Sequence, residues 1–190
     1  MITWEELENA VNNCTRCPLC NGRHNVVLGT GNRNSDILFV GEGPGYHEDM
    51  EGEPFVGAAG HLLDKMLASI GLSRKEVYIA NVVKCRPPSN RDPLPEEYNV
   101  CLNWLRWQYV LIQPKIVVCL GRIAAKALIE PEFRITRDRG KWYYKKGVDF
   151  TATFHPSALL RDESKKRPAW EDFKAIKERL EHCRFKGNEK

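Results

Sequence analysis

The chain has 190 residues, of which 42% are hydrophobic and 28% charged, and this length and composition fit one globular domain over residues 1–190. No stretch approaches about 18 consecutive apolar residues, which argues against a membrane-spanning helix, and the acidic, amphipathic N-terminus lacks the layout of a signal peptide. We therefore expect a cytoplasmic protein without a membrane partner. Its net charge of +4 permits a polyanionic partner but does not require one.

The first half of the chain alternates apolar runs with amphipathic stretches. Residues 36–42 (DILFVGE) predict a buried strand that ends in a Gly/Pro turn. Residues 57–72 predict a helix that ends at Gly71 and carries its apolar side chains on one face. Residues 77–83 predict a second strand, and the Pro-rich segment 84–95 that follows it must be a loop.

The second half continues the same alternation. A helix is predicted at 95–113, a strand at 115–121 and a short helix at 121–129, and residues 134–147 are expected to form a hairpin or an edge excursion. The last two predicted elements are a strand at 149–156 and a terminal helix at 168–183. This order predicts an α/β fold, with three αβα layers and a central, mostly parallel four-stranded sheet.

Three of the predicted strands end in segments rich in polar residues, glycine and proline: GEGPG, NVVKCRPP and FHPSALLR. Parallel strands end at the same edge of a sheet, and ligands of such folds bind at the carboxyl ends of the strands. The sequence therefore predicts one functional site where these three segments meet.

Seven cysteines are many for a chain of this size, and an odd number fits a complete disulfide framework badly. Two cysteines three residues apart near the N-terminus, with a second pair later in the chain, can hold a metal centre in an N-terminal metal-binding segment. The ligands that we favour are Cys14, Cys17, Cys85 and Cys101. Cys20 could replace one of them. Zinc and an iron–sulfur cluster both suit thiolates, and buried free cysteines are the alternative.

Taken together, several segments of the sequence match the pattern of a known protein family. The matching segments are CTRCPL, DILFVGEGPG, EDMEGEPFVGAAGHLLDKML, YIANVVKCRPPSNRDP, the cysteine at 101, KIVVCLG and HPSALLR. By their order and spacing, from Cys14 to the last helix, the chain resembles family 4 uracil-DNA glycosylases. The resemblance implies a structural [4Fe–4S] cluster, no nucleotide cofactor, and a monomer that removes uracil from single- or double-stranded DNA by base flipping.

Two features depart from the family pattern, and a third separates the chain from a related branch. Gly43 stands where the family usually has alanine in its GEAPG motif, and glycine preserves the tight turn. Cys20 is an additional thiol. A related branch that cross-links to DNA carries a His-containing insertion, whereas no histidine lies between Arg134 and Lys146 here. We therefore expect a turnover enzyme.

Four residues are expected to bind the flipped uracil. Phe55 would stack on the base, although it could be a core side chain. Asn81, at the end of an apolar strand, would read the Watson–Crick edge, although it could be a turn or capping residue. By resemblance, Glu48 would lie against the C5 edge, a surface glutamate being the alternative. Gly43 would contribute the backbone of its turn.

Two residues are expected to carry the chemistry. His155 would donate a hydrogen bond to uracil O2, where negative charge develops as the glycosidic bond breaks. Glu42 would position the attacking water or stabilise the cationic sugar. Both lie at the ends of predicted strands that should be neighbours, which favours function over a structural role.

The remaining predicted residues would contact DNA. Leu159 and Leu160 could form an exposed wedge that fills the hole left by the base, or could begin a buried helix. The candidates for backbone contacts are Arg86, Ser89, Arg91, Ser157 and Arg161. The alternatives to a uracil-DNA glycosylase are a non-catalytic, metal-stabilised nucleic-acid-binding module and a glycosylase that also takes hypoxanthine or mismatched thymine. A zinc hydrolase of nucleotides ranks lower, because the His/Asp ligands of an open catalytic zinc are missing.

Overall fold

The computed structural model describes residues 2–187, and within them the chain forms one six-stranded sheet in the order β1-β3-β2-β4-β6-β5. The strands are β1 (Thr30–Gly31), β2 (Ile37–Gly41), β3 (Tyr78–Asn81), β4 (Ile116–Leu120), β5 (Tyr143–Lys145) and β6 (Val148–Thr153). The four central strands are parallel, as predicted, while β1 and β5 pair antiparallel at the two edges. The prediction of four strands was therefore too low, because edge strands of two and three residues are too short to show a period.

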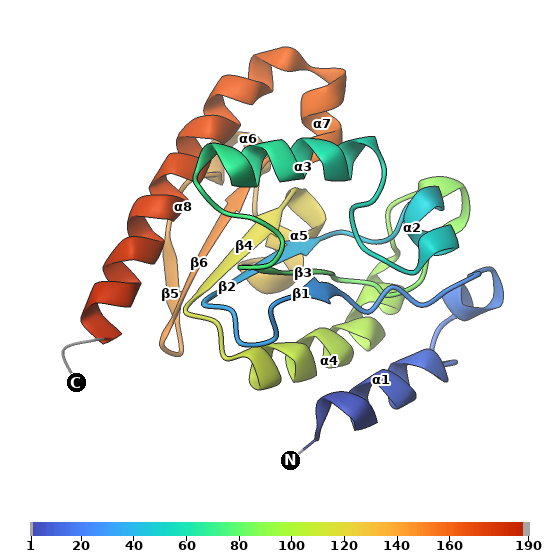
Figure 1. Ribbon diagram of the computed structural model, residues 1–190. Helices are drawn as coiled ribbons and strands as arrows, with labels where there is room; N and C mark the ends of the chain where they lie inside the picture. Colours follow the sequence, from blue (N-terminus) through green and yellow to red (C-terminus); the bar gives the residue numbers. More distant parts are fainter. Residues whose placement is uncertain (1, 188–190) are drawn as a thin grey trace.

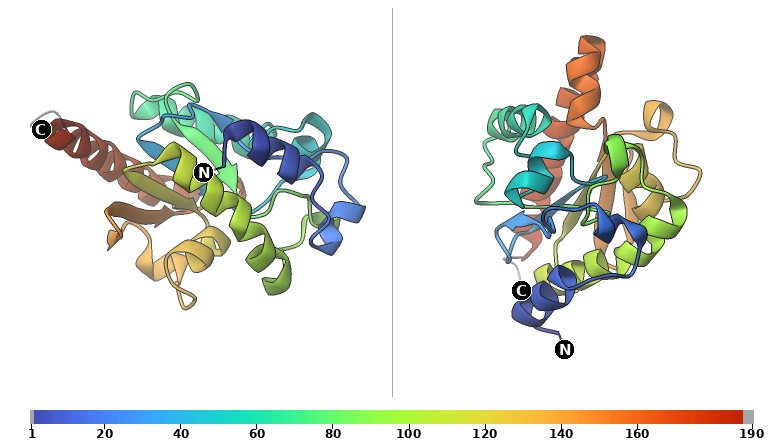
Figure 2. Two further views of the ribbon diagram at one scale, coloured as in Figure 1. Left: turned by 90° about the horizontal axis from the view of Figure 1, so that it is seen from below. Right: turned by 90° about the vertical axis from the view of Figure 1, so that its right-hand side faces the viewer.

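Helices cover both faces of the sheet, which confirms the three-layer arrangement (Figures 1 and 2). One face packs against α1 (Trp4–Asn12), α4 (Pro95–Ile112) and α5 (Arg122–Leu128), and the other against α3 (Ala58–Ser69) and α8 (Lys166–Gly187). The shorter elements are η1 (Pro18–Asn21), α2 (Tyr46–Glu51), η2 (Pro88–Asn90), α6 (Ile135–Asp138), α7 (Pro156–Arg161) and η3 (Glu163–Lys165). No helix of the described part is long and apolar enough to cross a membrane.

Both cores follow from the apolar runs of the parallel strands. All five residues of β2 are buried, and successive side chains point to opposite faces. Leu38 and Val40 join the core under α1, α4 and α5, whereas Ile37 and Phe39 join the core under α3 and α8. Strands buried on both faces are continuously apolar rather than alternating, which is why the sequence marks them so clearly.

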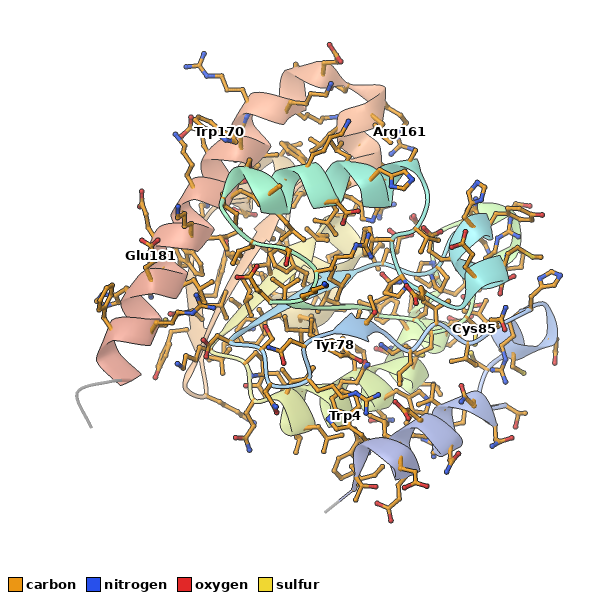
Figure 3. The ribbon with its side chains drawn as sticks, in the orientation of Figure 1. Trp4, Tyr78, Cys85, Arg161, Trp170 and Glu181 are labelled. Atoms are coloured by element: carbon orange, nitrogen blue, oxygen red, sulfur yellow. The ribbon has the colours of Figure 1, made fainter. Side chains whose placement is uncertain are left out.

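The segment 134–147, expected as a hairpin or an edge excursion, begins with the short helix α6 and then forms a hairpin between β5 and β6. Lys146 and Gly147 make its turn with positive φ angles of 48° and 86°. At the other edge, Trp4 of α1 packs on Tyr78 of β3, with ring centroids 5.5 Å apart (Figure 3). The N-terminal helix is thereby tied to the sheet.

The sheet brings the predicted site residues to one edge. Gly41 at the end of β2 pairs with Asn81 at the end of β3, and Leu120 at the end of β4 pairs with Thr153 at the end of β6. The segments that follow these four strands therefore begin at the same edge of the sheet, as expected for parallel strands. The strands before Glu42 and His155 are not the neighbours that we expected, because β4 lies between β2 and β6.

Candidate active site and cysteine cavity

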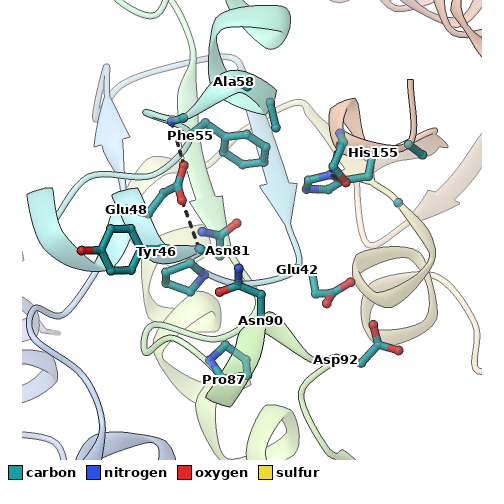
Figure 4. Close-up of a pocket in the computed structure, with 18 of the residues that line it drawn as sticks. Glu42, Tyr46, Glu48, Phe55, Ala58, Asn81, Pro87, Asn90, Asp92 and His155 are labelled. Atoms are coloured by element: carbon teal, nitrogen blue, oxygen red, sulfur yellow. Dashed lines mark hydrogen bonds between the residues drawn. The ribbon is translucent and has the colours of Figure 1, made fainter. Parts of the chain in front are cut away.

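A large pocket lies at the carboxyl ends of the four parallel strands (Figure 4). Its walls come from the turn after β2, the loop before α3, the loop before α4, the start of α5 and the helix α7. The predicted residues that line it are Glu42, Gly43, Glu48, Phe55, Asn81, Arg91, His155, Ser157 and Arg161. The structure therefore gathers most of the predicted site in one cavity.

Asn81 presents an unpaired acceptor to this pocket. The residue is 2% exposed, and its Oδ1 is the one buried side-chain polar atom of the described residues without a hydrogen-bond partner. Gly41 lies opposite: a Cβ there would be 2.4 Å from Asn81 Oδ1 and 2.6 Å from Phe55 Cζ. A buried acceptor without a partner is costly, and this one can accept a hydrogen bond from a donor that enters the pocket.

Phe55 is held in a strained backbone conformation. Its φ is 57°, in the left-handed region that a bulky residue rarely adopts. The Arg74 guanidinium donates to the carbonyl oxygens of Phe55 and of Pro54, the latter at 3.0 Å, and a Cβ on Gly60 would be 1.7 Å from the Phe55 oxygen. The loop is therefore fixed from two sides, and the Phe55 ring stacks on His155 with centroids 5.5 Å apart.

Glu48 connects two walls of the pocket rather than lying free on the surface. Its carboxylate accepts hydrogen bonds from the N–H groups of Gly45 at 3.1 Å and of Val56 and Gly57 at 3.0 Å each. The glutamate thereby ties the turn after β2 to the loop that carries Phe55. Charge-assisted bonds of this kind are stronger than bonds between neutral groups.

His155 is neutral and its tautomer is fixed. The Ser157 N–H donates to His155 Nδ1 at 3.2 Å, and the Ser157 hydroxyl lies 2.8 Å from the same atom. A backbone N–H can only donate, so Nδ1 is the acceptor and the ring proton lies on Nε2. The pKa of His155 is lowered to about 4, mainly by burial and also by the positive charge of Arg161. The negative charge of Glu48 opposes this shift.

Two residues that the sequence analysis missed stand beside Glu42. The pKa of Glu42 is raised to about 7, mainly by burial and also by the Asp92 carboxylate, while the positive charge of Arg122 opposes the shift. Asp92 and Arg122 form an ion pair, and both line the pocket. Arg122 directly follows a predicted strand, which was a usable signal, whereas Asp92 reaches the site only through the fold of the loop before α4.

The residues predicted to contact DNA differ in their exposure and in the partners that they already bind. Arg91 donates to both carboxylate oxygens of Glu97, at 2.9 and 2.7 Å. Arg86 donates to Asn90 and covers the exposed ring of Tyr46. The exposed residues are Ser89, Leu160 and Arg161. Ser157 is partly buried beside His155.

The expectation of two exposed leucines is wrong for Leu159. Its side chain is 1% exposed and packs with Phe154 and Ala169, whereas Leu160 is 49% exposed. Both residues belong to the helix α7, whose geometry directs successive side chains to different sides. Only Leu160 is therefore free to act as a wedge.

Five cysteines line a second, small cavity: Cys14, Cys17, Cys20, Cys85 and Cys101. Three N–H groups donate to sulfur: Arg23 Nη1 to Cys85 at 3.3 Å, Trp104 Nε1 to Cys14 at 3.4 Å, and the Lys84 backbone to Cys101 at 3.3 Å. The structure thus brings together cysteines that are up to 87 residues apart, and surrounds them with donors suited to thiolates.

The donor set of this cavity is sulfur, which suits an iron–sulfur cluster and suits zinc as well. In the described residues no three His, Cys, Asp or Glu side chains close around one metal position. Cys20 donates to Asn21 at 3.4 Å.

Comparison with known proteins supplies the deciding observation. The family model described as the uracil DNA glycosylase superfamily matches residues 28–174, well over half of the chain. The chain belongs to the uracil-DNA glycosylase superfamily. Curated relatives of this superfamily carry the name type-4 uracil-DNA glycosylase, which confirms the resemblance seen in the motifs.

Three of these type-4 relatives match almost end to end. The protein of Archaeoglobus fulgidus is 46% identical, covering 94% of each chain, and that of Sulfurisphaera tokodaii is 45% identical over 94% of this chain and 85% of its own. The protein of Thermotoga maritima is 48% identical over 86% of this chain and 88% of its own. The superfamily match includes the whole pocket together with Cys85 and Cys101, while Cys14 and Cys17 precede it.

Proposed function

We propose that this member of the uracil-DNA glycosylase superfamily binds an extruded uracil in the pocket and hydrolyses its N-glycosidic bond, which leaves an abasic site in DNA. The observation that carries the proposal is the unpaired Asn81 Oδ1, which faces a pocket whose opposite wall holds a neutral histidine. We also propose that residues 1–190 act as one domain and as a cytoplasmic monomer, on single- or double-stranded DNA.

Base identity is read by the amide of Asn81. Its Oδ1 accepts from uracil N3–H, and its amide N–H group donates to uracil O4. Cytosine has no hydrogen on N3 and carries an amino group in place of O4, so it would leave both groups of Asn81 unpaired, and a buried site rejects such a mismatch strongly. Phe55 supplies the aromatic face on which the base stacks, and Glu48 lies against the C5 edge, where a methyl group would distinguish thymine.

Bond cleavage uses His155 and Glu42. The bond between the sugar C1′ and uracil N1 breaks and its electron pair moves into the base, so that negative charge develops on O2. The Nε2–H of His155 donates to this oxygen, and the N–H group of Gly43 adds to the same stabilisation, because Pro44 has no N–H and the Gly45 N–H already donates to Glu48. The oxygen of a water held by the Glu42 carboxylate bonds to C1′, and a proton of that water passes to the carboxylate.

The DNA strand is held around the pocket mouth. Leu160, exposed at the end of α7, fills the space that the extruded base leaves. The proposed backbone contacts are Arg86, Ser89, Arg91, Ser157 and Arg161. Ser157 would serve twice, because its N–H and hydroxyl already hold His155.

We further propose that Cys14, Cys17, Cys85 and Cys101 hold a [4Fe–4S] cluster. When bound, the cluster supplies a structural cross-link rather than a reaction step, because the cysteine cavity is separate from the pocket. It joins the N-terminal segment to the loop after β3 and to α4. Arg23, Trp104 and Lys84 donate to the ligand sulfurs and orient them.

The test uses end-labelled oligonucleotides that contain one uracil opposite guanine, opposite adenine or in a single strand, followed by alkali to reveal abasic sites. Matched substrates carry hypoxanthine or a thymine mispaired with guanine, and Asn81→Ala is the control variant. Cleavage at uracil that is lost in Asn81→Ala supports the proposal. Cleavage at the other bases would instead establish a broader glycosylase, and DNA binding without any abasic sites would establish a non-catalytic module.

Adding one methyl group at Gly41 should damage the site while sparing the fold. The added Cβ would push the Asn81 amide and the Phe55 ring out of place, and displacing a positioned group by about 1 Å costs roughly 100-fold in rate. We expect Gly41→Ala to lower kcat/KM for uracil by about this factor with a small change in Tm. Gly22→Ala is the matched control, since no atom lies within 4 Å of a Cβ there. Equal activity of the two variants would contradict this account of Gly41.

Glu48→Gln should loosen the two walls that the carboxylate connects. The glutamine NH2 cannot accept from a backbone N–H, so at least one partly buried donor loses its partner. A fully buried donor without a partner costs about 1–3 kcal/mol, which is the upper bound here. We expect a lower Tm and a loss of uracil-releasing activity, measured beside Glu51→Gln, an exposed glutamate of the same helix. Indistinguishable Tm values for the two variants would show that these bonds contribute little.

A further inference from the structure

Lys84 is a buried lysine that the mechanism above does not use. Its side chain is 1% exposed, and Nζ donates to the Asn81 carbonyl oxygen at 2.8 Å and to Gln108 Oε1 at 2.6 Å. Gln108 is fully buried, and its Nε2 donates to the Leu28 carbonyl oxygen at 2.9 Å and to the Tyr78 hydroxyl at 3.3 Å. The glutamine amide can therefore face the lysine only with its oxygen.

The ammonium of Lys84 has no carboxylate partner among the residues that the structure describes; both of its acceptors are neutral carbonyl oxygens. A charge buried in this way needs a nearby opposite charge. The negative charges that act on the Lys84 ammonium are those of Cys101, whose Sγ also accepts the Lys84 backbone N–H at 3.3 Å, and of Cys85, the next residue; both cysteines line the cysteine cavity. Four thiolates give an iron–sulfur cluster a net negative charge, which would compensate the ammonium.

Lys84 thus bonds to one residue of the cysteine cavity and to one residue of the pocket. Its backbone binds a cysteine of the small cavity, and its ammonium binds the main chain of Asn81, whose side chain faces the pocket with an unpaired oxygen. The strand β3 ends at Asn81, and the next two residues still donate to the segment after β2, Val82 N–H to the Gly41 oxygen at 2.9 Å and Val83 N–H to the Glu42 oxygen at 3.1 Å. The Lys84 ammonium adds a further bond at this end of the strand, to the Asn81 carbonyl oxygen.

We propose that Lys84 is a positioning residue that couples the iron–sulfur cluster to base reading. The negative charge of the cluster holds the Lys84 ammonium in place. The ammonium, which also donates to Gln108, in turn holds the end of β3 that carries the Asn81 amide. This inference rests on the proposed function and on the proposed cluster. It assigns the cluster an electrostatic effect on the pocket, in addition to its cross-linking role.

The experiment separates the charge of Lys84 from its positioning effect. Lys84→Met removes both, whereas Gln108→Met removes the brace and leaves the ammonium beside the cluster. Lys75→Met is the control, because this exposed lysine precedes β3, at the opposite end of the strand from Asn81. For each holoprotein we would measure the iron content, the midpoint potential of the cluster, and kcat and KM on a single-stranded uracil oligonucleotide.

We expect Lys84→Met to lower the midpoint potential, because a nearby cation favours the reduced, more negative cluster, and to lower kcat/KM by about 10- to 100-fold, as loss of an outer-shell partner does. Gln108→Met should lower kcat/KM at an unchanged potential, and Lys75→Met should change neither. The double variant should lose no more activity than Lys84→Met alone, because the two residues act as one unit.

An unmoved potential in an iron-replete Lys84→Met protein, or wild-type kcat/KM in Gln108→Met, would overturn the proposal. Should Lys84→Met fail to assemble a cluster, the activity of Gln108→Met decides. A wild-type protein that releases no uracil would instead contradict the proposed function, and the potentials would still report whether Lys84 faces the cluster.

Discussion

His155→Ala is expected to lower kcat for uracil release about 100- to 1,000-fold, the loss that follows removal of one donor to a developing oxyanion. The Ser157 N–H fixes the proton of His155 on Nε2, so the imidazole donates without carrying a charge. The measurement is a single-turnover time course with saturating enzyme on a uracil-containing oligonucleotide, in which binding does not limit the rate.

The low pKa of His155, about 4, provides a second measurement on the same variant. Between pH 4 and an ordinary histidine pKa of about 6.5, the unfolded chain binds a proton at this position that the folded protein does not. The contribution of His155 to the free energy of unfolding therefore falls as the pH drops through this window. His155→Ala removes that contribution, so the Tm difference between pH 7 and pH 5 should shrink. An unchanged difference would show that His155 is charged in the folded protein.

Glu42→Gln is expected to lower kcat by about 100- to 10,000-fold, the range for loss of a general base. Because burial and Asp92 raise the pKa of Glu42 to about 7, the reactive carboxylate forms only as the pH rises through that value. The wild-type rate should therefore increase between about pH 6 and 8 and then level off. Glu42→Gln should lose this dependence, which a pH series of single-turnover rates would show.

Two neighbours of Glu42 should move that pH profile in opposite directions. Asp92→Asn removes a negative charge that disfavours the second carboxylate, so the pKa of Glu42 falls and the rise shifts to lower pH. Arg122→Met removes the opposing positive charge and shifts the rise upward. A profile that neither variant moves would show that another group controls the rise.

The parallel core of the sheet, and the edge of the sheet at which the pocket lies, could be predicted from the sequence because both depend on short runs of consecutive apolar residues. Glu42 follows one apolar run and Asn81 lies in another, and both runs predict buried strands. The meeting of the two strand ends, where Gly41 pairs with Asn81, follows from parallel topology. The contacts of Glu48 with Val56 and Gly57 could not be predicted, because backbone N–H groups exist at almost every residue and leave no trace in the sequence. Asp92 was missed for a related reason, since loop conformation alone brings it to Glu42.

Helical phase accounts for another difference between prediction and structure. Leu159 and Leu160 are chemically identical, and a loop would expose both. The short helix α7 instead sends one into the core and the other into solvent. A stretch of six residues is too short for its periodicity to reveal which leucine is buried.

The wide spacing of the cysteines has a consequence for biosynthesis. Cys14 and Cys101 line one cavity although they are 87 positions apart in the sequence. A ribosome adds about 5–20 residues per second, so Cys101 is synthesised roughly 4–17 s after Cys14. During this interval the first thiols are present without their later partners. Assembly of the proposed cluster at the complete site must therefore come late in translation or after it, and the early thiols are open to oxidation until then.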